Sequence, residues 1–299
     1  MTVRLGINPL TWTNDDLPSL GSDTPLETCL AEGREAGFAG FELGQKFPRT
    51  PQALNQVLND HDLALVSGWY SSRLLERSVE EELAAVESHL QLLKQCGARV
   101  MVFCEVSRCV HGDQMRPVSQ RPHLQKADWP RLIDGLNQVG AHLREHGIQL
   151  VYHHHLGTVI ESQADIEQLM DNTSDAVGLL LDFGHLVVAR GDPLAIVRRY
   201  GPRIHHIHCK DVRLDVLKEI RNRDKSFLDG VLDGLFAVTG DGDIDFAPAL
   251  SHMKDQGYEG WLVVEAEQDP CIAHPMTHAR RGYQGLKAVA EQAGFQITE

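Results

Sequence analysis

The sequence lacks two features that would tie the protein to membranes or nucleic acids. No run of apolar residues approaches the roughly 18 that a membrane-spanning helix needs. Lysine and arginine form no cluster, and they number 28 against 42 aspartates and glutamates, so the formal net charge is -14. An acidic chain repels phosphate backbones, and charge of one sign favours solubility. We therefore expect neither a membrane nor a nucleic acid among its partners.

Common cofactor motifs are missing as well. The six cysteines show no CxxC spacing, which excludes a zinc framework of cysteine pairs and is typical of reduced cytosolic thiols. No Gly-x-Gly-x-x-Gly motif follows the first apolar run at residues 3–7, so a dinucleotide-binding fold is not favoured. The same run begins almost at Met1, and no signal-peptide segment precedes it. The expectation is a soluble, cytoplasmic protein.

Eight short apolar segments recur along the chain and predict strands. Each is too short for a helix and lacks clean alternation, which is typical of parallel strands buried on both faces. Amphipathic stretches between them predict helices, several of which end at a glycine just before the next strand. The predicted strands are residues 3–7, 40–43, 63–67, 99–103, 149–152, 177–181, 204–207 and 261–264. The clearest predicted helices are residues 26–36, 79–96, 129–146, 162–172, 193–200 and 246–256.

This alternation favours a closed (β/α)8 TIM barrel of the α/β class over an open sheet. The chain has 299 residues, and one such barrel commonly takes about 250. No linker, repeat or low-complexity segment divides it, so we expect a single domain over residues 1–299. Two connections, residues 107–128 and 212–245, are longer than the usual ~2–6 residues. Both follow strand ends, where barrel enzymes place loops that cover substrate.

Metal-binding side chains occur at the end of each of the last four predicted strands. Imidazole and carboxylate groups suit Mn, Co, Zn or Fe, and a barrel builds its active site from several strand ends. The order of these segments predicts one metal site that serves chemistry on a small polar substrate. The segments are Tyr152-His153-His154-His155, Leu181-Asp182-Phe183-Gly184-His185, Ile207-His208-Cys209-Lys210-Asp211 and Val264-Glu265-Ala266-Glu267.

Each segment taken alone has a plainer explanation. Residues two apart on a strand share a face, so His153 and His155 point together while His154 points away. A histidine at a strand end often only bonds to a neighbouring loop, and Asp182 could simply cap the next helix. Glu265 ends an apolar strand, where an ionised carboxylate needs a partner or a metal. The repetition at four successive strand ends is what favours the metal site.

On these segments the chain resembles the xylose-isomerase-like barrel superfamily, whose members bind a divalent metal through residues at the ends of these strands. The resemblance implies that His153, Asp182, His208 and Glu265 are the metal ligands. His153 stands where most members of the superfamily carry a glutamate.

A narrower resemblance covers nearly the whole chain. The matching stretches are residues 5–12, 40–44, 104–106, 111–113, 121–122, 152–158, 240–246 and 260–270, and they resemble the inosose dehydratase family of hydro-lyases. The resemblance implies removal of water from 2-keto-myo-inositol (scyllo-inosose) in myo-inositol catabolism. The product would be a trihydroxycyclohexane-1,2-dione, and the metal would be Mn or Co.

Such a reaction needs proton transfer beside the metal. A hydroxyl β to a ketone leaves once the α-proton is removed, and a Lewis-acidic metal stabilises the enolate that forms. The candidates for proton transfer are His155, His185, Lys210 and Glu267. We hypothesise that His185 or Lys210 is the base and that His155 donates a proton or orients the substrate. The candidates for binding substrate hydroxyls are Asn8, Trp12, Glu42, Glu105 and Arg213.

Three other functions fit parts of this pattern. A ketose isomerase or 3-epimerase would use the same metal and the same proton abstraction but would return the proton to carbon, and fold and ligands do not separate it from a dehydratase. A metal-dependent endonuclease would need a basic groove, which a net charge of -14 argues against. A non-catalytic sugar-binding barrel would fail to bind metal. The superfamily resemblance also implies that copies of the chain can associate, although the sequence carries no interface signature.

Overall fold

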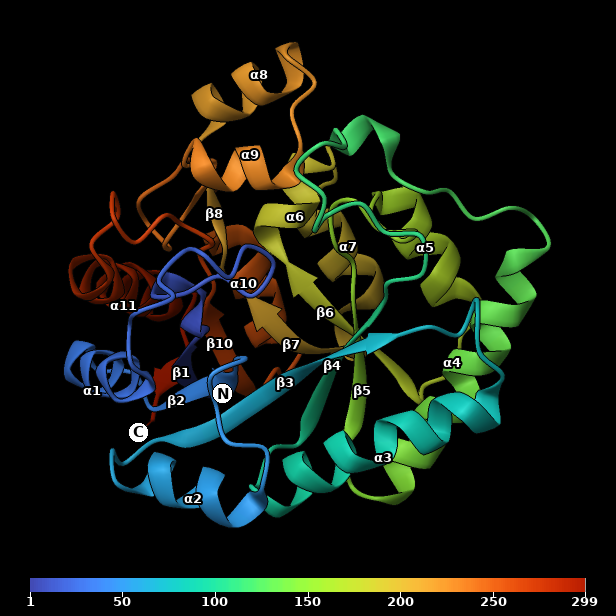
Figure 1. Ribbon diagram of the computed structural model, residues 1–299, viewed down its shortest axis with the longest axis horizontal. Coiled ribbons are helices and arrows are strands. Elements are labelled where there is room, and N and C mark those ends of the chain that lie inside the picture. The colour runs from blue at the N-terminus through green and yellow to red at the C-terminus, as the bar shows by residue number, and fades with distance from the viewer. Residues whose placement is uncertain (299) are drawn as a thin grey trace.

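Eight parallel strands close into a barrel in the computed structural model, which describes residues 1–298. Each strand pairs with its neighbours, and β1 pairs with both β2 and β10, so the sheet closes on itself. Figure 1 shows the helices arranged around this ring of strands. The predicted TIM barrel is thereby confirmed. Its strands are β1 (Thr2–Ile7), β2 (Gly40–Leu43), β3 (Ala64–Ser72), β4 (Val100–Glu105), β5 (Gln149–His153), β6 (Val177–Asp182), β7 (Ile204–His208) and β10 (Gly260–Val264).

Most predicted strand boundaries differ from the observed ones by one or two residues, and β3 is the exception. The prediction ended this strand at residue 67, whereas β3 continues to Ser72. Of its added residues, Gly68 pairs with Leu43 of β2, and Trp69 to Ser72 pair with Val102 to Glu105 of β4. A polar strand end of this kind has no apolar run to reveal it, because the pairing partner is far away in the sequence.

The six predicted helices are all present, and residues 1–298 contain five further α-helices. Capping boxes start two of the predicted helices, at Ser78 with Glu81 and at Ser162 with Asp165. Within residues 1–298, no helix combines the length and apolar character needed to cross a bilayer. The predicted helices are α1 (Leu26–Ala36), α3 (Val79–Gln95), α4 (Asp128–Glu145), α5 (Gln163–Asn172), α7 (Pro193–Tyr200) and α10 (Ala247–Asp255). The others are α2 (Pro51–Asn59), α6 (Phe183–Val188), α8 (Leu214–Asn222), α9 (Phe227–Leu232) and α11 (Pro275–Gln292).

The interior of the barrel is filled below the strand ends, which places the site at their carboxyl side. Val100 and Val102 pack with Val151 and Leu180 in one apolar cluster. Gly40 lies close to the tryptophan of the last strand, since a Cβ at Gly40 would come within 2.8 Å of Trp261. A glycine is therefore required for the indole to fill the lower part of the barrel.

The connection predicted at residues 212–245 is not an irregular loop, and the prediction is corrected here. It holds α8 and α9 between two short antiparallel strands, β8 (Asp211–Val212) and β9 (Phe236–Ala237). Apolar side chains give this segment its own small core, which periodicity had not identified. Figure 1 shows α8 and α9 projecting beyond the ring of helices. Val212, Leu217, Phe227, Leu228, Val231, Leu235 and Phe236 form that core together with Leu156.

Candidate metal centre and active site

Four neighbouring strands bring the predicted metal-binding side chains together. His153 ends β5, Asp182 ends β6, His208 ends β7 and Glu265 directly follows β10. One nitrogen or oxygen atom from each lies within 4.8 Å of the others, and all four residues are buried. Strand pairing produces this convergence, because Asp182 is in register with His208.

Both histidines direct a ring nitrogen at the other members of the cluster. His153 Nδ1 donates to the carbonyl oxygen of His154 at 2.7 Å, which leaves the lone pair on Nε2. That nitrogen lies 3.9 Å from Asp182 Oδ2. His208 Nε2 donates to Glu42 Oε1 at 3.1 Å, so its Nδ1 faces inward. This Nδ1 lies 2.6 Å from Glu265 Oε2 and 3.4 Å from Asp182 Oδ2.

The cluster has the properties expected of a cation site. Among residues 1–298, Asp182 Oδ2 and His208 Nδ1 are buried without a hydrogen-bond partner, because the close oxygens lie outside hydrogen-bond geometry. Burial and the charge of His208 lower the pKa of His153 to about 4, which keeps the ring neutral as metal binding requires. Burial opposes charge on His208, but Glu265 and Glu42 outweigh it and raise its pKa, so a metal ion bound there would displace a proton from this ring. The four side chains therefore fit a divalent metal ion.

Glu42 was predicted to bind substrate, but its oxygens are already used inside the protein. Oε1 accepts hydrogen bonds from Ser67 Oγ at 2.6 Å, His206 Nε2 at 2.8 Å and His208 Nε2 at 3.1 Å. Oε2 accepts one from Asn8 Nδ2 at 2.7 Å. Glu42 borders the cavity, yet its contacts make it the residue that orients His208.

The four predicted proton-transfer residues form a second group beside the first. Lys210 is fully buried, and its Nζ lies 2.7 Å from Glu265 Oε1, 2.7 Å from Glu267 Oε1 and 3.0 Å from His185 Nε2. Burial opposes its charge, but the two glutamates outweigh this and raise the pKa of Lys210. A lysine held as a cation cannot accept a proton, so this arrangement does not favour the hypothesis that Lys210 is the base.

His155, His185 and Glu267 differ in their access to the cavity. His155 and Glu267 form part of its wall, whereas His185 lies behind them against Lys210. Burial and the neighbouring His155 and Lys210 lower the pKa of His185 well below its usual range. Burial, together with His111 and His153, does the same to His155. Burial raises the pKa of Glu267 to about 7, against the opposing charge of Lys210.

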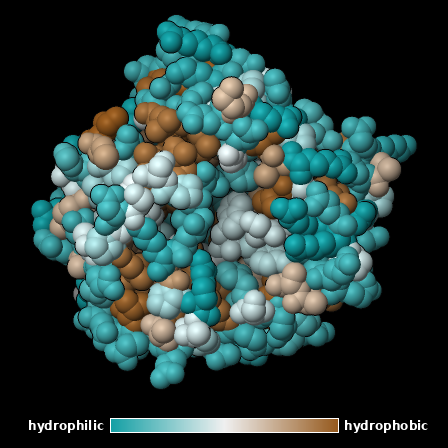
Figure 2. Space-filling view, viewed as in Figure 1, coloured by the Kyte–Doolittle hydropathy of each residue, from teal (hydrophilic) through white to brown (hydrophobic). Residues whose placement is uncertain are grey.

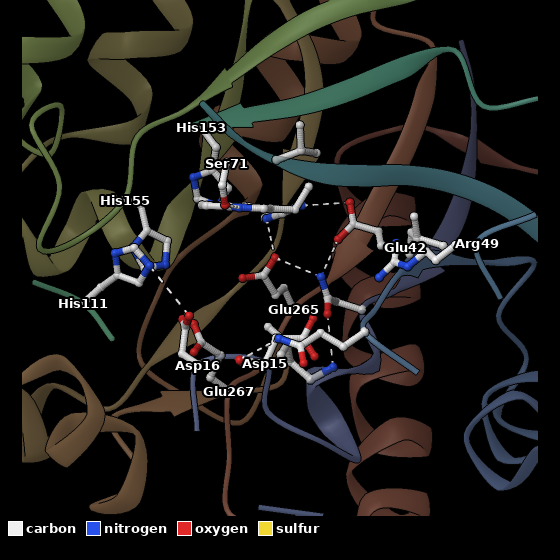
Figure 3. Close-up of a pocket in the computed structure, with 17 residues that line it drawn as sticks. Asp15, Asp16, Glu42, Arg49, Ser71, His111, His153, His155, Glu265 and Glu267 are labelled. Atoms are coloured by element: carbon white, nitrogen blue, oxygen red, sulfur yellow. Dashed lines mark hydrogen bonds and ion pairs between the residues drawn. The ribbon is translucent and has the colours of Figure 1, made fainter. Parts of the chain in front are cut away.

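The cavity in front of this cluster holds about 240 Å³, which suits a small molecule. Figure 3 shows the carboxylates of Asp15 and Asp16 across it from His153, and Asp16 Oδ1 lies 3.7 Å from His111 Nε2. Figure 2 shows a hollow with a largely hydrophilic rim on the same face of the protein. The sequence analysis did not select several residues of the wall, because they lie on loops and on the polar end of β3. They are Asp15, Asp16, Gln45, Arg49, Trp69, Ser71 and His111.

Three predicted substrate-binding residues lie outside the cavity wall, and these predictions are corrected. Trp12 is fully buried, packs against Phe41 and donates from Nε1 to Glu32 Oε2 at 2.6 Å. It is therefore a core residue, because its indole N–H is bonded to a carboxylate of α1 and neither residue borders the cavity.

Glu105 and Arg213 are used to fix the backbone. Glu105 accepts hydrogen bonds from the backbone nitrogens of Leu74 at 2.6 Å and Ser107 at 2.8 Å. Arg213 donates to the carbonyl oxygen of Gly234 at 2.8 Å and to Asp241 Oδ2 at 2.9 Å. Asn8 borders the cavity, as Glu42 does. Its side-chain nitrogen Nδ2 lies 2.7 Å from Glu42 Oε2 and 3.4 Å from Glu265 Oε2, so the amide links these two carboxylates.

A barrel with polar side chains at its carboxyl-terminal strand ends is typical of barrel enzymes, and the buried histidine and carboxylate cluster found there could bind a metal ion. The sequence pattern of the xylose isomerase-like TIM barrel family matches residues 30–289. The chain belongs to this family, which confirms the broader resemblance.

Curated relatives are similar over nearly their full length. The chain is 47% identical over 298 residues to the rhizopine catabolism protein MocC of Rhizobium meliloti, covering 100% of this chain and 92% of that protein. It is 42% identical to the inosose dehydratase of Clostridium perfringens, over 95% of this chain and 97% of the relative. The enzyme of the same name from Lacticaseibacillus casei is 43% identical, over 96% and 97% of the two chains. The resemblance to inosose dehydratases is thereby confirmed.

Solved structures support the fold. A probable 3-DHS dehydratase, AsbF, from Bacillus anthracis aligns with a TM-score of 0.69 at 12% identity, over 95% of this chain and 99% of that one. The IOLI protein, whose structure contains a bound zinc atom, aligns with a TM-score of 0.66 at 16% identity, over 97% and 98%. At these identities the likeness establishes a shared barrel and no shared reaction.

Proposed function

We propose that this protein is an inosose dehydratase, a hydro-lyase that removes water from 2-keto-myo-inositol to give a trihydroxycyclohexane-1,2-dione. The observation that carries the proposal is the group of four buried metal-capable side chains beside a small polar cavity. Relatives named inosose dehydratase, at 42% and 43% identity over nearly the whole chain, support the choice of reaction.

The proposed metal site consists of His153, Asp182, His208 and Glu265. A divalent metal bound there would supply Lewis-acid stabilisation of the negative charge that develops on the substrate's ketone oxygen. We propose Mn or Co, the metals that the resemblance to inosose dehydratases implies, and two imidazoles with two carboxylates are compatible with either ion. Glu42 would keep His208 in the tautomer that leaves Nδ1 free.

The proton transfers are assigned to the two candidates that face the cavity. His155 Nδ1 donates to the carbonyl oxygen of Leu156 at 2.8 Å, so its Nε2 carries the lone pair and can take the α-proton. Glu267 is placed to give a proton to the departing hydroxyl, which leaves as water. Lys210 and His185 stay behind this wall, where the ammonium of Lys210 balances the charge of Glu265 and the charge that Glu267 acquires when it gives up its proton. The unsaturated enol then tautomerises to the dione.

Other polar groups of the cavity wall would bind the substrate's hydroxyls. Asp15, Asp16 and Ser71 border the cavity together with the guanidinium of Arg49. A polyol ring needs several such partners, since each unmatched buried polar group costs about 1–3 kcal/mol.

The proposal also covers the cellular location, the domain organisation and the binding partner of the protein. All six cysteines are free thiols, five of them buried or half-buried, which supports a reducing cytoplasmic location. The main apolar core includes residues from Val3 to Phe295, which supports a single domain. The substrate is the small polyol ketone itself.

The decisive experiment follows dione formation by absorbance with 2-keto-myo-inositol. Protein treated with a chelator should give no product, and added Mn or Co should restore it. A substrate carrying deuterium on the α-carbon should release that label to solvent only in the metal-loaded protein. If fully metal-loaded protein consumes the ketone without losing water, the protein is a ketose isomerase or epimerase. If it does not alter the ketone at all, the proposed substrate is wrong.

A further inference from the structure

The ammonium of Lys210 lies inside a set of donors that resembles a metal site. Its three nearest polar atoms are Glu265 Oε1, Glu267 Oε1 and His185 Nε2, at 2.7, 2.7 and 3.0 Å. His155, His185 and Glu267 themselves meet the geometric conditions for holding a metal ion, with one donor atom from each within 4.8 Å of the others. The lysine nitrogen therefore lies among side chains that could also bind a metal ion.

Glu265 joins this position to the proposed metal centre. Its Oε2 lies 2.6 Å from His208 Nδ1, on the side of the four proposed ligands, while its Oε1 contacts Lys210. A carboxylate that serves two cations through its two oxygens is the usual bridge in two-metal enzymes, where the ions are about 3.5–4 Å apart. In this protein the second partner of the bridge is an ammonium group.

The rest of the lysine side chain is held so that the nitrogen cannot move elsewhere. Gly184 leaves room for the stem, because a Cβ at that position would come within 2.6 Å of Lys210 Cγ. The ring of Phe236 lies 4.6 Å from Nζ on the other side. These contacts, with complete burial, make Lys210 a fixed part of the site.

We propose that the Lys210 ammonium takes the place of a second metal ion and restricts the centre to one divalent metal. The inference rests on the proposed metal centre, and it explains why that centre would hold one metal ion per chain. Removal of Lys210 leaves Glu265 Oε1 and Glu267 buried without the cation that contacts both of them. Because uncompensated buried carboxylates are costly, the vacated position would attract another cation.

The test is metal content per chain after metal removal, reloading with Mn or Co, and gel filtration. The native protein should hold one equivalent, and Lys210→Ala should hold two. Lys210→Arg, which keeps a cation in place, should hold one. The double variant Lys210→Ala with Glu267→Gln should return to one, because it removes a ligand of the vacated position. Lys225→Ala, which removes a lysine paired with Asp233, is the matched control and should also hold one.

A spectroscopic measurement separates a bridged ion from one bound at the surface. The electron paramagnetic resonance spectrum of Mn-loaded Lys210→Ala should show coupling between two ions, whereas the native protein should show resolved hyperfine lines of an isolated ion. Lys210→Ser, which leaves room for a water ligand, repeats the test if the alanine variant does not fold.

The outcomes distinguish the two proposals. If folded Lys210→Ala and Lys210→Ser hold one equivalent, or if the native protein holds two, the inference is overturned and the proposed dehydratase stands. If the native protein binds no metal, both are overturned.

Discussion

The two halves of the barrel rim use their buried carboxylates in opposite ways. At the ends of β2 and β4, Glu42 and Glu105 accept hydrogen bonds from neighbouring side chains and backbone, which occupy their oxygens. At the end of β6, Asp182 Oδ2 has no hydrogen-bond partner within residues 1–298 and faces two imidazoles. A carboxylate whose oxygen accepts no hydrogen bond and faces other metal-binding groups can bind a cation. A carboxylate whose oxygens already accept several hydrogen bonds instead fixes the position of its neighbours. Position at a strand end does not by itself distinguish them.

The largest effect should come from removing a carboxylate of the proposed metal site. Asp182→Asn should abolish tight metal binding and lower kcat/KM by about 10³-fold or more, since Lewis-acid stabilisation is worth several kcal/mol. Metal content and initial rates measure this. Glu105→Gln is the matched control from the other half of the rim. It should lower the melting temperature and keep the metal content of the native protein. Equal losses of metal in the two variants would show that Asp182 and Glu105 do not differ in their roles.

The next largest effect should come from the two residues assigned to proton transfer. His155→Ala and Glu267→Gln should each lower kcat by about 10²–10⁴-fold. His155→Ala should also stop release of the α-deuterium label, because the base acts first. Glu267→Gln, in contrast, should still release label while dione formation is slow. Unchanged label release by His155→Ala would show that another group is the base.

A smaller effect should follow from loosening His208. Glu42→Gln loses the charged acceptor of the His208 Nε2–H while keeping its size, so metal affinity should fall by about 10–100-fold. Competition with a chelator measures the affinity, and the visible spectrum of the Co-loaded variant should shift. With saturating metal, most of the activity should return. If Glu42 instead bound substrate directly, KM would rise and metal affinity would not change.

The smallest effect should come from Trp12, which the sequence placed at the site and the structure places in the core. Trp12→Phe removes the hydrogen bond to Glu32, so the free energy of unfolding should fall by about 1–2 kcal/mol with kcat and KM unchanged. Denaturant unfolding and steady-state kinetics are the measurements. An increase in KM would show that Trp12 contributes to substrate binding after all.

The sequence predicted the barrel well because its strands and helices have local signals. The composition of residues 204–207 predicted a buried strand, and the structure has β7 at Ile204–His208. The segment from α8 to α9 was taken for a loop, because its small core forms between its own apolar residues and Leu156 from another strand end. Such non-local packing leaves no periodic pattern in the chain.

The candidate site divides in the same way. By itself, the sequence determined which strand ends carry histidines and carboxylates, and the resemblance to the xylose-isomerase-like barrels selected His153, Asp182, His208 and Glu265 among them. Only the tertiary structure decided which oxygens are already hydrogen-bonded, that Lys210 is clamped between two glutamates, and that Asp15 and Asp16 close the cavity. The reason is physical: a residue's type limits what it can bind, but its partners are set by atoms brought together from distant parts of the chain.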